Sequence, residues 1–169
     1  AARPDNLTNA MATSVDYRTE SPEDLTGNLS FTQDPEDIEY VEFDGITCVD
    51  RTCIFNSNEG FRMQYQGDRY QTLNEVFTIE TYVYMTDMVY GTPLEIWWGG
   101  DDNFACLGWD GYRFGFGQDD FASDKSVMEE EDRDLTDGWY HLVVTSDGTT
   151  DNLYVNGELV GSGTGPEKG

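Results

Sequence analysis

The feature that most constrains the fold is a strict alternation of apolar and polar residues near the C-terminal end of the chain. Residues 137–163 have the sequence DGWYHLVVTSDGTTDNLYVNGELVGSG. Alternation with period two is typical of half-buried strands, and an Asn156–Gly157 pair between apolar runs is a strong hairpin signal. The stretch therefore predicts antiparallel hairpins in one layer of a β-sandwich, with one face formed by Trp139, His141, Val143 and Thr145 and the other by Tyr140, Leu142, Val144 and Ser146.

The same period recurs earlier in the chain. Residues 75–86 place Phe77, Ile79, Thr81, Val83 and Met85 on a core-like face, with Val76, Thr78, Glu80, Tyr82 and Tyr84 opposite. Further strands are expected at 28–31, 38–43, 61–66, 94–98, 103–109 and 112–117. The last three form an antiparallel meander, because GGDD and DG are tight-turn sequences. Residues 118–138 show no regular apolar spacing and are predicted to form a long loop that crosses between sheets.

Composition favours the same fold class, all-β, because 10 Tyr, 9 Phe, 4 Trp and 18 Gly suit strands and turns. The length of 169 residues fits one domain. We predict a polar N-terminal arm over residues 1–36, a β-sandwich over 37–165 and a tail over 166–169.

The arm contains two N-glycosylation sequons, at Asn6 and Asn28. With no transmembrane run or signal peptide, and a start (AARPDN) that suits a mature chain after signal removal, we expect a secreted or cell-surface protein.

The charge is strongly negative: 34 acidic residues stand against 9 basic ones, a net charge of -25. Such a surface repels nucleic acid and anionic lipid, so we expect no nucleic-acid partner and no membrane insertion. Three interpretations remain: a solvated surface that keeps the protein soluble, including in high salt, a set of divalent-cation sites, or a surface complementary to a basic partner. Because the carboxylates repel one another, we expect salt or calcium to raise stability.

Three cysteines leave an odd thiol. Cys48 and Cys53 have a spacing that a short hairpin disulfide can bridge, and unpaired thiols are the alternative. Cys106 lies in an apolar stretch and is predicted to be a buried thiol. A zinc site is not expected, since the chain has one histidine and no second close cysteine pair.

The strand sequences FTIETYVYM and DGWYHLVVTSDGTTDNLYVNGELVGSG resemble the laminin-G-like jelly-roll domains of the concanavalin A-like lectin and glucanase superfamily. YVEFDG resembles the first core strand of those domains, and WGGDDNFACLGWDGYRFGFG resembles their middle sheet, so the resemblance covers residues 38–165. It implies a concanavalin A-like sandwich. The family's usual final strand has no counterpart here. Three explanations are open: the N-terminal arm substitutes for that strand, a neighbouring chain donates it, or the sequence is a fragment. We expect the arm or a strand-donating neighbour to cover the edge.

Catalysis is not expected. Retaining glycosidases need two carboxylates about 5–5.5 Å apart. The acidic run Glu129–Asp132 has no apolar alternation and is interpreted as a solvated loop, while Glu80 is a lone acid on a strand face. His141 occupies a position where the family has a structural histidine, which favours a structural role over acid–base work.

The resemblance instead implies a rim site for calcium, which these domains often bind with one or two Asp and backbone carbonyls. Two oxygen-rich turns at adjacent strands are candidates, formed by Asp101, Asp102 and Asn103 and by Asp119 and Asp120. Ordinary turn chemistry is the alternative explanation for the same residues, and Asp-rich turns are common without a metal.

Aromatic side chains suggest a second kind of site, because aromatic faces stack on sugar rings. The candidates are Trp97, Trp98, Trp109 and Tyr112. The expected function is thus a non-catalytic extracellular module that binds glycan or protein, with calcium as a candidate cofactor. A structural subunit of an extracellular fibre or surface assembly is the alternative, and a glycan hydrolase is a third possibility.

Overall fold

A computed structural model describes residues 15–16, 23–24, 29–31, 40–49, 63–65, 76–85, 91–97, 104–117, 121 and 125–166. These residues form strands joined by turns, and none of them lies in an α-helix. Nor do the described ranges contain a helix with the length and apolarity that crossing a membrane requires. The chain divides into two compact units, residues 1–69 and 70–169, which are described separately below.

The described residues of the N-terminal unit form three two-stranded antiparallel pairs. Their strands are β1 (Val15–Asp16) with β2 (Glu23–Asp24), β3 (Leu29–Phe31) with β6 (Met63–Tyr65), and β4 (Tyr40–Phe43) with β5 (Ile46–Val49). Asp44 and Gly45, both with positive φ, turn β4 into β5. The predicted sandwich began at residue 37, whereas the structure places the β4–β5 hairpin in the N-terminal unit, where its two strands pair with each other.

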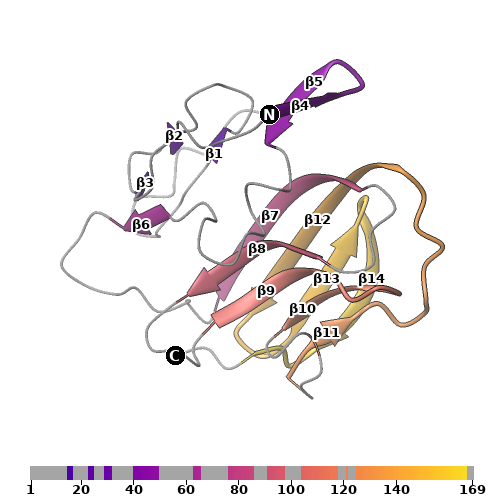
Figure 1. The fold of residues 1–169 in the computed structure, drawn as a ribbon. Helices are drawn as coiled ribbons and strands as arrows, with labels where there is room; N and C mark the ends of the chain where they lie inside the picture. Colours follow the sequence, from indigo (N-terminus) through magenta and orange to yellow (C-terminus); the bar gives the residue numbers. More distant parts are fainter. Residues whose placement is uncertain are drawn as a thin grey trace. The chain divides into compact units, whose positions relative to one another are not determined.

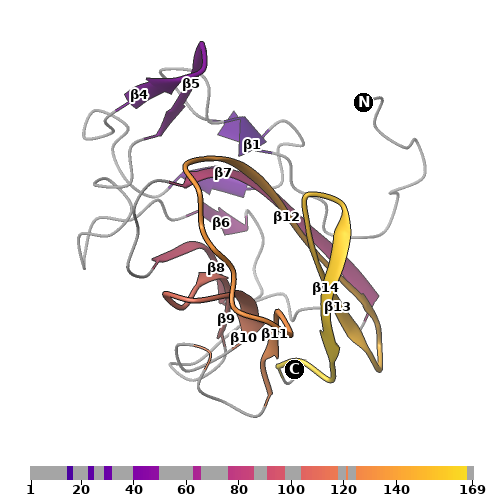
Figure 2. The ribbon, with the colours of Figure 1, turned by 90° about the vertical axis from the view of Figure 1, so that its right-hand side faces the viewer.

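The C-terminal unit is a two-layer antiparallel sandwich (Figure 1). One sheet has the order β14-β13-β12-β7, and its strands are β7 (Val76–Met85), β12 (Gly138–Asp147), β13 (Asp151–Val155) and β14 (Glu158–Gly163). The other has the order β11-β10-β9-β8, with β8 (Gly91–Trp97), β9 (Phe104–Trp109), β10 (Phe114–Gly117) and β11 (Val127–Met128). Figure 2 shows the two layers from the side. The all-β sandwich prediction is confirmed.

The core lies between these layers and is filled from both inner faces. The first sheet contributes Ile79, Met85, Tyr140, Leu142, Val144, Leu153 and Val155, and the second contributes Ala105, Leu107, Trp109, Phe114, Phe116 and Val127. The predicted inward set of β7 is therefore confirmed, and of the two faces predicted for β12 the one formed by Tyr140, Leu142, Val144 and Ser146 is the inner one. Pro166, which the prediction assigned to a tail, is also fully buried.

Residues Val127–Arg133, which we call the strap, hold the two sheets together along one side. The prediction made this region part of a loop, but Val127 and Met128 pair with Phe116 and Gly115 of β10. Beyond them, Glu130 N–H donates to the carbonyl of Val160 in β14. A Cβ added at Gly161 of β14 would lie 2.1 Å from the Met128 carbonyl oxygen, so the strap approaches β14 at a distance that glycine permits.

Candidate functional site

The outer faces of the two sheets differ in exposure. In β9, residues Ala105 to Trp109 are all buried, so this strand is covered on both sides. Phe121, itself 8% exposed, lies against Gly115 on the outer side of β10, where an added Cβ would be 3.0 Å from its ring. The β14-β13-β12-β7 sheet instead has exposed or half-buried side chains on its outer side. Within the described residues, the outer side of the β14-β13-β12-β7 sheet is therefore more exposed than the outer side of β9 and β10.

We call this surface the outer face and define it by the outward residues Val76, Thr78, Glu80, Tyr82, Tyr84, Trp139, His141, Val143, Thr145, Asp147, Asn152, Tyr154, Leu159 and Ser162. The strand register aligns them in rows across the sheet. Tyr84 pairs with Trp139, Tyr82 with His141, and Thr78 with Thr145, which in turn pairs with Asn152. Successive rows lie about 6.6–6.8 Å apart along a strand.

A three-residue cluster lies on the outer face at the edge strand β7 and its neighbour β12. The rings of Tyr82 and His141 stack at 4.2 Å between centroids with an interplanar angle of 9°. His141 Nε2 lies 2.8 Å from Glu80 Oε1. An ionised carboxylate only accepts hydrogen bonds, so this geometry assigns the proton to Nε2. The imidazole is thereby held between a carboxylate and an aromatic ring.

This cluster leaves one face of Tyr82 open. The imidazole covers the face of the Tyr82 ring that points toward β12. Tyr82 as a residue is nevertheless 63% exposed. The accessible face therefore points away from His141. Because the ring is fixed by stacking, a ligand that packs on it meets a surface that is already oriented.

The turn after β13 fixes the backbone beneath the cluster. Asn156 adopts φ 51° and Gly157 φ 82°, the two positive values that a type I′ hairpin turn needs. Asn156 N–H donates to the His141 carbonyl at 2.8 Å, and His141 N–H donates to Asn156 Oδ1 at 2.9 Å. The sequence-predicted hairpin is thus confirmed, and it also holds the position of His141 on β12.

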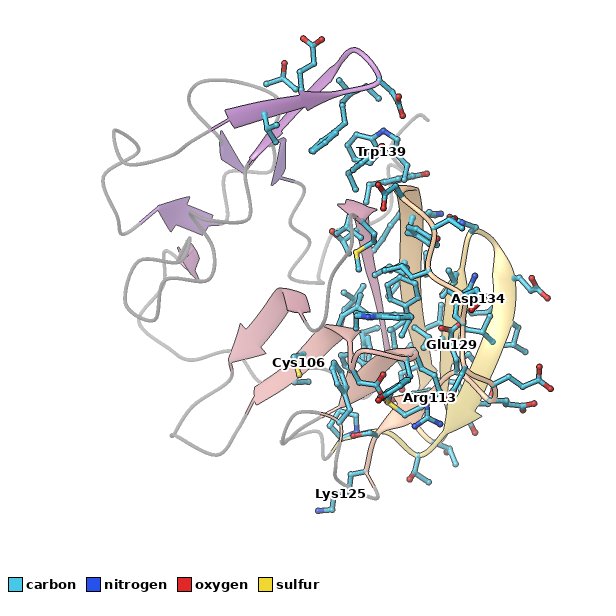
Figure 3. The ribbon with its side chains drawn as sticks, turned by 45° about the vertical axis from the view of Figure 1, so that its right-hand side comes forward. Cys106, Arg113, Lys125, Glu129, Asp134 and Trp139 are labelled. Carbon is cyan, nitrogen blue, oxygen red and sulfur yellow. The ribbon has the colours of Figure 1, made fainter. Side chains whose placement is uncertain are left out.

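The rest of the outer face adds rings on one side and hydroxyl and amide groups on the other. Tyr84 and Trp139 meet edge to face at 5.4 Å between centroids. Figure 3 shows Trp139 at the start of β12. At the opposite end of the sheet, Ser162 Oγ donates to Asn152 Oδ1 at 2.7 Å. Aromatic rings beside short polar side chains match the two kinds of contact that a sugar offers, its C–H face and its hydroxyls.

Glu129 corrects the prediction that the acidic run Glu129–Asp132 is solvated throughout. Glu130, Glu131 and Asp132 are exposed, but Glu129 is 4% exposed. Figure 3 shows Glu129 on the strap, within the sandwich. Its Oε2 accepts from Phe114 N–H at 2.8 Å, and its Oε1 accepts from Arg133 Nε at 2.9 Å and also from Nη2.

The pKa of Arg133 is raised above its ordinary value, first by the hydrogen bond to Glu129 and then by the neighbouring negative charge, while burial opposes the shift. The Arg133 guanidinium also lies 5.8 Å from the centre of the Phe114 ring. Glu129 and Arg133 both hold the strap against Phe114 of β10. This ion pair is therefore structural and separate from the outer face.

The structure describes the side chains of three of the residues singled out from the sequence: Trp109, Tyr112 and Cys106. Trp109 is 2% exposed and packs against Phe114 at 5.0 Å between ring centroids, which corrects the expectation that it stacks on a ligand: its position on β9 points inward. Tyr112 is 67% exposed in the turn between β9 and β10, as a stacking residue must be. Cys106 is a buried thiol, as predicted, and its Sγ donates to the Gly117 carbonyl.

The remaining predictions lie outside what the structure describes. Trp97 and Cys48 lie in strands β8 and β5, and their side chains are outside the description. The other residues outside it are Asn6, Asn28, Cys53, Trp98, Asp101, Asp102, Asn103, Asp119 and Asp120. In the part of the chain that is described, no group of three or more His, Cys, Asp or Glu residues is arranged to hold a metal ion.

The sandwich and its sequence agree with one family. The family model described as the concanavalin A-like lectin/glucanases superfamily, of laminin G type, matches residues 62–168. The chain belongs to this superfamily. The family resemblance expected from the strand sequences is therefore confirmed, although the match begins after the β4–β5 hairpin that the prediction included. Comparison with curated proteins and with solved structures gave no match.

Sequence reasoning missed Tyr82 as a ligand-binding candidate. The sequence contained a signal for this site. The outward residues of β7 include two tyrosines and a glutamate, and a strand face that only contacts solvent does not require aromatic side chains. The sequence alone does not show how β7 and β12 pair, and it is this pairing register that places His141 directly beside Tyr82.

Proposed function

We propose that the C-terminal sandwich is a non-catalytic recognition module that binds a glycan on the outer face. Laminin G-like domains are generally non-catalytic, and the superfamily includes lectins. The observation that supports the proposal most directly is Tyr82, an exposed ring held by stacking on His141, with Glu80 next to it. A sugar ring that stacks on Tyr82 places its hydroxyl groups within reach of the Glu80 carboxylate.

The spacing of carboxylates supports a binding role over hydrolysis. Glu80 pairs in register with Val143, and Asp147 lies four residues farther along β12, about 13 Å away at 3.3 Å per residue. Glu158 is on β14, three strands from β7, about 14 Å away at 4.7–4.9 Å per strand. Among the described residues of this sheet, Glu80 therefore has no second carboxylate at the 5–5.5 Å separation of retaining glycosidases.

The proposal extends to location and cofactor. A secreted or cell-surface module is supported by the two sequons, Asn6 and Asn28. Calcium remains a candidate aid to binding at the rim, supported by the Asp-rich turns at 101–103 and 119–120. If calcium assists, chelation with EDTA weakens glycan binding, and added calcium restores it.

A glycan array probed with three forms of the protein tests the proposal: the unmodified chain, Tyr82→Ala and Tyr112→Ala. Tyr112 is the matched control, since it is as exposed as Tyr82 but lies in a turn of the other sheet. We expect Tyr82→Ala to weaken binding at least about tenfold, and Tyr112→Ala to leave it unchanged. Loss in Tyr112→Ala alone would move the site to the other sheet, and loss in both variants would contradict a site confined to the outer face. Self-association without glycan binding would favour the structural-subunit alternative.

A further inference from the structure

The outer face has an unusual charge composition. Strands β7, β12, β13 and β14 contain no lysine and no arginine. The outer face has two carboxylates, Glu80 and Asp147, and His141 already bonds to the first. Asp147 Oδ1 accepts from the backbone N–H groups of Thr149 and Thr150, so it is occupied within its own turn. An anionic ligand would meet no fixed positive charge on these strands.

Glu80 is the charged group best placed to meet a ligand. Its side chain is 58% exposed, and the bond to His141 uses Oε1. Tyr82, two residues along the same face, lies about 6.6–6.8 Å away and presents its open ring face. A carboxylate next to an aromatic face attracts cations, because the ring's quadrupole and the carboxylate act in the same direction.

The charge of the whole chain acts the same way over longer distances. A net charge of -25 attracts cations and repels anions before contact, within the screening length of the solution. The local pair of Glu80 and Tyr82 and the overall charge thus favour the same class of ligand.

We propose that the glycan is cationic, an oligosaccharide of 2-amino-2-deoxyhexose units whose ammonium group binds the Glu80 carboxylate while a sugar ring stacks on Tyr82. This inference rests on the proposed function, since it assigns the ligand class of the same site. A sugar fits better than a basic peptide because the polar side chains beyond Glu80 are short hydroxyl and amide groups suited to ring hydroxyls: Thr78, Thr145, Asn152 and Ser162.

Titration calorimetry with four defined probes tests the proposal at a pH where the amine is protonated. The probes are a glucosamine hexamer, the same hexamer fully N-acetylated, a galacturonic acid hexamer and hexalysine. In low salt, the glucosamine hexamer should bind roughly tenfold more tightly than its acetylated counterpart. The galacturonic acid hexamer should not bind, and the advantage of the amino sugar should shrink as salt is added.

Two charge-neutralising variants identify the responsible carboxylate. Glu80→Gln keeps an oxygen that accepts from His141 Nε2 but removes the charge, so it should abolish the preference for the amino sugar. Glu158→Gln removes another exposed carboxylate of the same sheet, which pairs with Val155 next to the β13–β14 turn and lies outside the outer face, and it should leave most of the preference intact.

The outcomes separate this inference from the proposed function. If both glucosamine and acetylated hexamers bind equally and Tyr82→Ala abolishes both, the charge preference is wrong and glycan binding stands. If no hexamer binds, the proposed function fails as well. If hexalysine binds as tightly as the glucosamine hexamer and depends equally on Glu80, the site recognises a basic peptide, which overturns the amino-sugar assignment.

Discussion

Replacing Arg133 with methionine tests how much the buried Glu129–Arg133 pair contributes to stability. Methionine fills similar volume but leaves the Glu129 carboxylate, which is 4% exposed, with the Phe114 N–H as its remaining described donor. Breaking a buried ion pair by removing one partner costs about 3–5 kcal/mol. Because the Arg133 side chain is 27% exposed, water screens part of this loss, and we expect about 2–4 kcal/mol.

Thermal and urea unfolding, followed by circular dichroism, measure this effect. For a unit of about 100 residues, 1 kcal/mol corresponds to a Tm change of about 4–8 °C, so a loss of about 2–4 kcal/mol in Arg133→Met should lower Tm by roughly 8–32 °C. The double variant Glu129→Gln/Arg133→Met should recover part of the loss, because a neutral amide can still accept from Phe114 N–H and costs less to bury than a lone carboxylate.

Arg113→Met is the matched control. Arg113 lies 3.7 Å from both Asp110 and Asp132, its side chain is 36% exposed, and pairs of this kind contribute about 0–1 kcal/mol. The reasoning fails if the two arginine variants are equally stable, or if the double variant is less stable than Arg133→Met alone.

The pH dependence of the same variant has a definite sign. The pKa of Arg133 is raised in the folded state, so the stabilisation is fully present below the pKa of the unfolded state and is lost only as pH rises through the higher folded value. We therefore expect the arginine to stay charged, and the stability gap between wild type and Arg133→Met not to shrink, from about pH 7 to pH 10. A gap that closes over this alkaline range would contradict the assignment.

Three further predictions follow from the sequence and the packing. Added salt or calcium should raise Tm, because it screens the net charge of -25; equal melting curves in low and high salt would contradict this. Gly161→Ala should destabilise the sandwich by about 1–3 kcal/mol in urea, because its Cβ would lie 2.1 Å from the Met128 carbonyl oxygen. Ser162→Ala, at an exposed neighbour, should cost less than 1 kcal/mol by comparison, and equal effects would count against the close approach. Peptide mass mapping without reduction should recover Cys48 linked to Cys53, whereas alkylation of both thiols in the native protein would exclude that disulfide.

The strands and their facing were predictable because alternation is a local property. The inward residues of β7 and the two faces of β12 follow directly from period two, and the Asn156–Gly157 turn fixes the β13–β14 hairpin. Strand β11 escaped prediction because two paired residues, Val127 and Met128, are too short to show a period.

The candidate site was less predictable because it depends on register between distant strands. Tyr82 meets His141, and Glu80 bonds to it across 61 positions of sequence, through the β7–β12 pairing. Glu129 shows the same limit: its run of acidic neighbours indicates solvent, and only the approach of Phe114 from β10 reveals a buried acceptor. Local patterns thus specify which way a side chain points, while its partners depend on the assembled sheet.

The strap has a consequence for how the sandwich opens. Glu129 N–H donates to the Phe114 carbonyl of one sheet, and Glu130 N–H donates to the Val160 carbonyl of the other, so adjacent amides report on different layers. If the layers separate in one cooperative event, these two amides exchange with deuterium at the same free energy of opening. Faster exchange at Glu130 than at Glu129 would instead mean that the β13–β14 hairpin detaches first while the other layer keeps its hydrogen bonds.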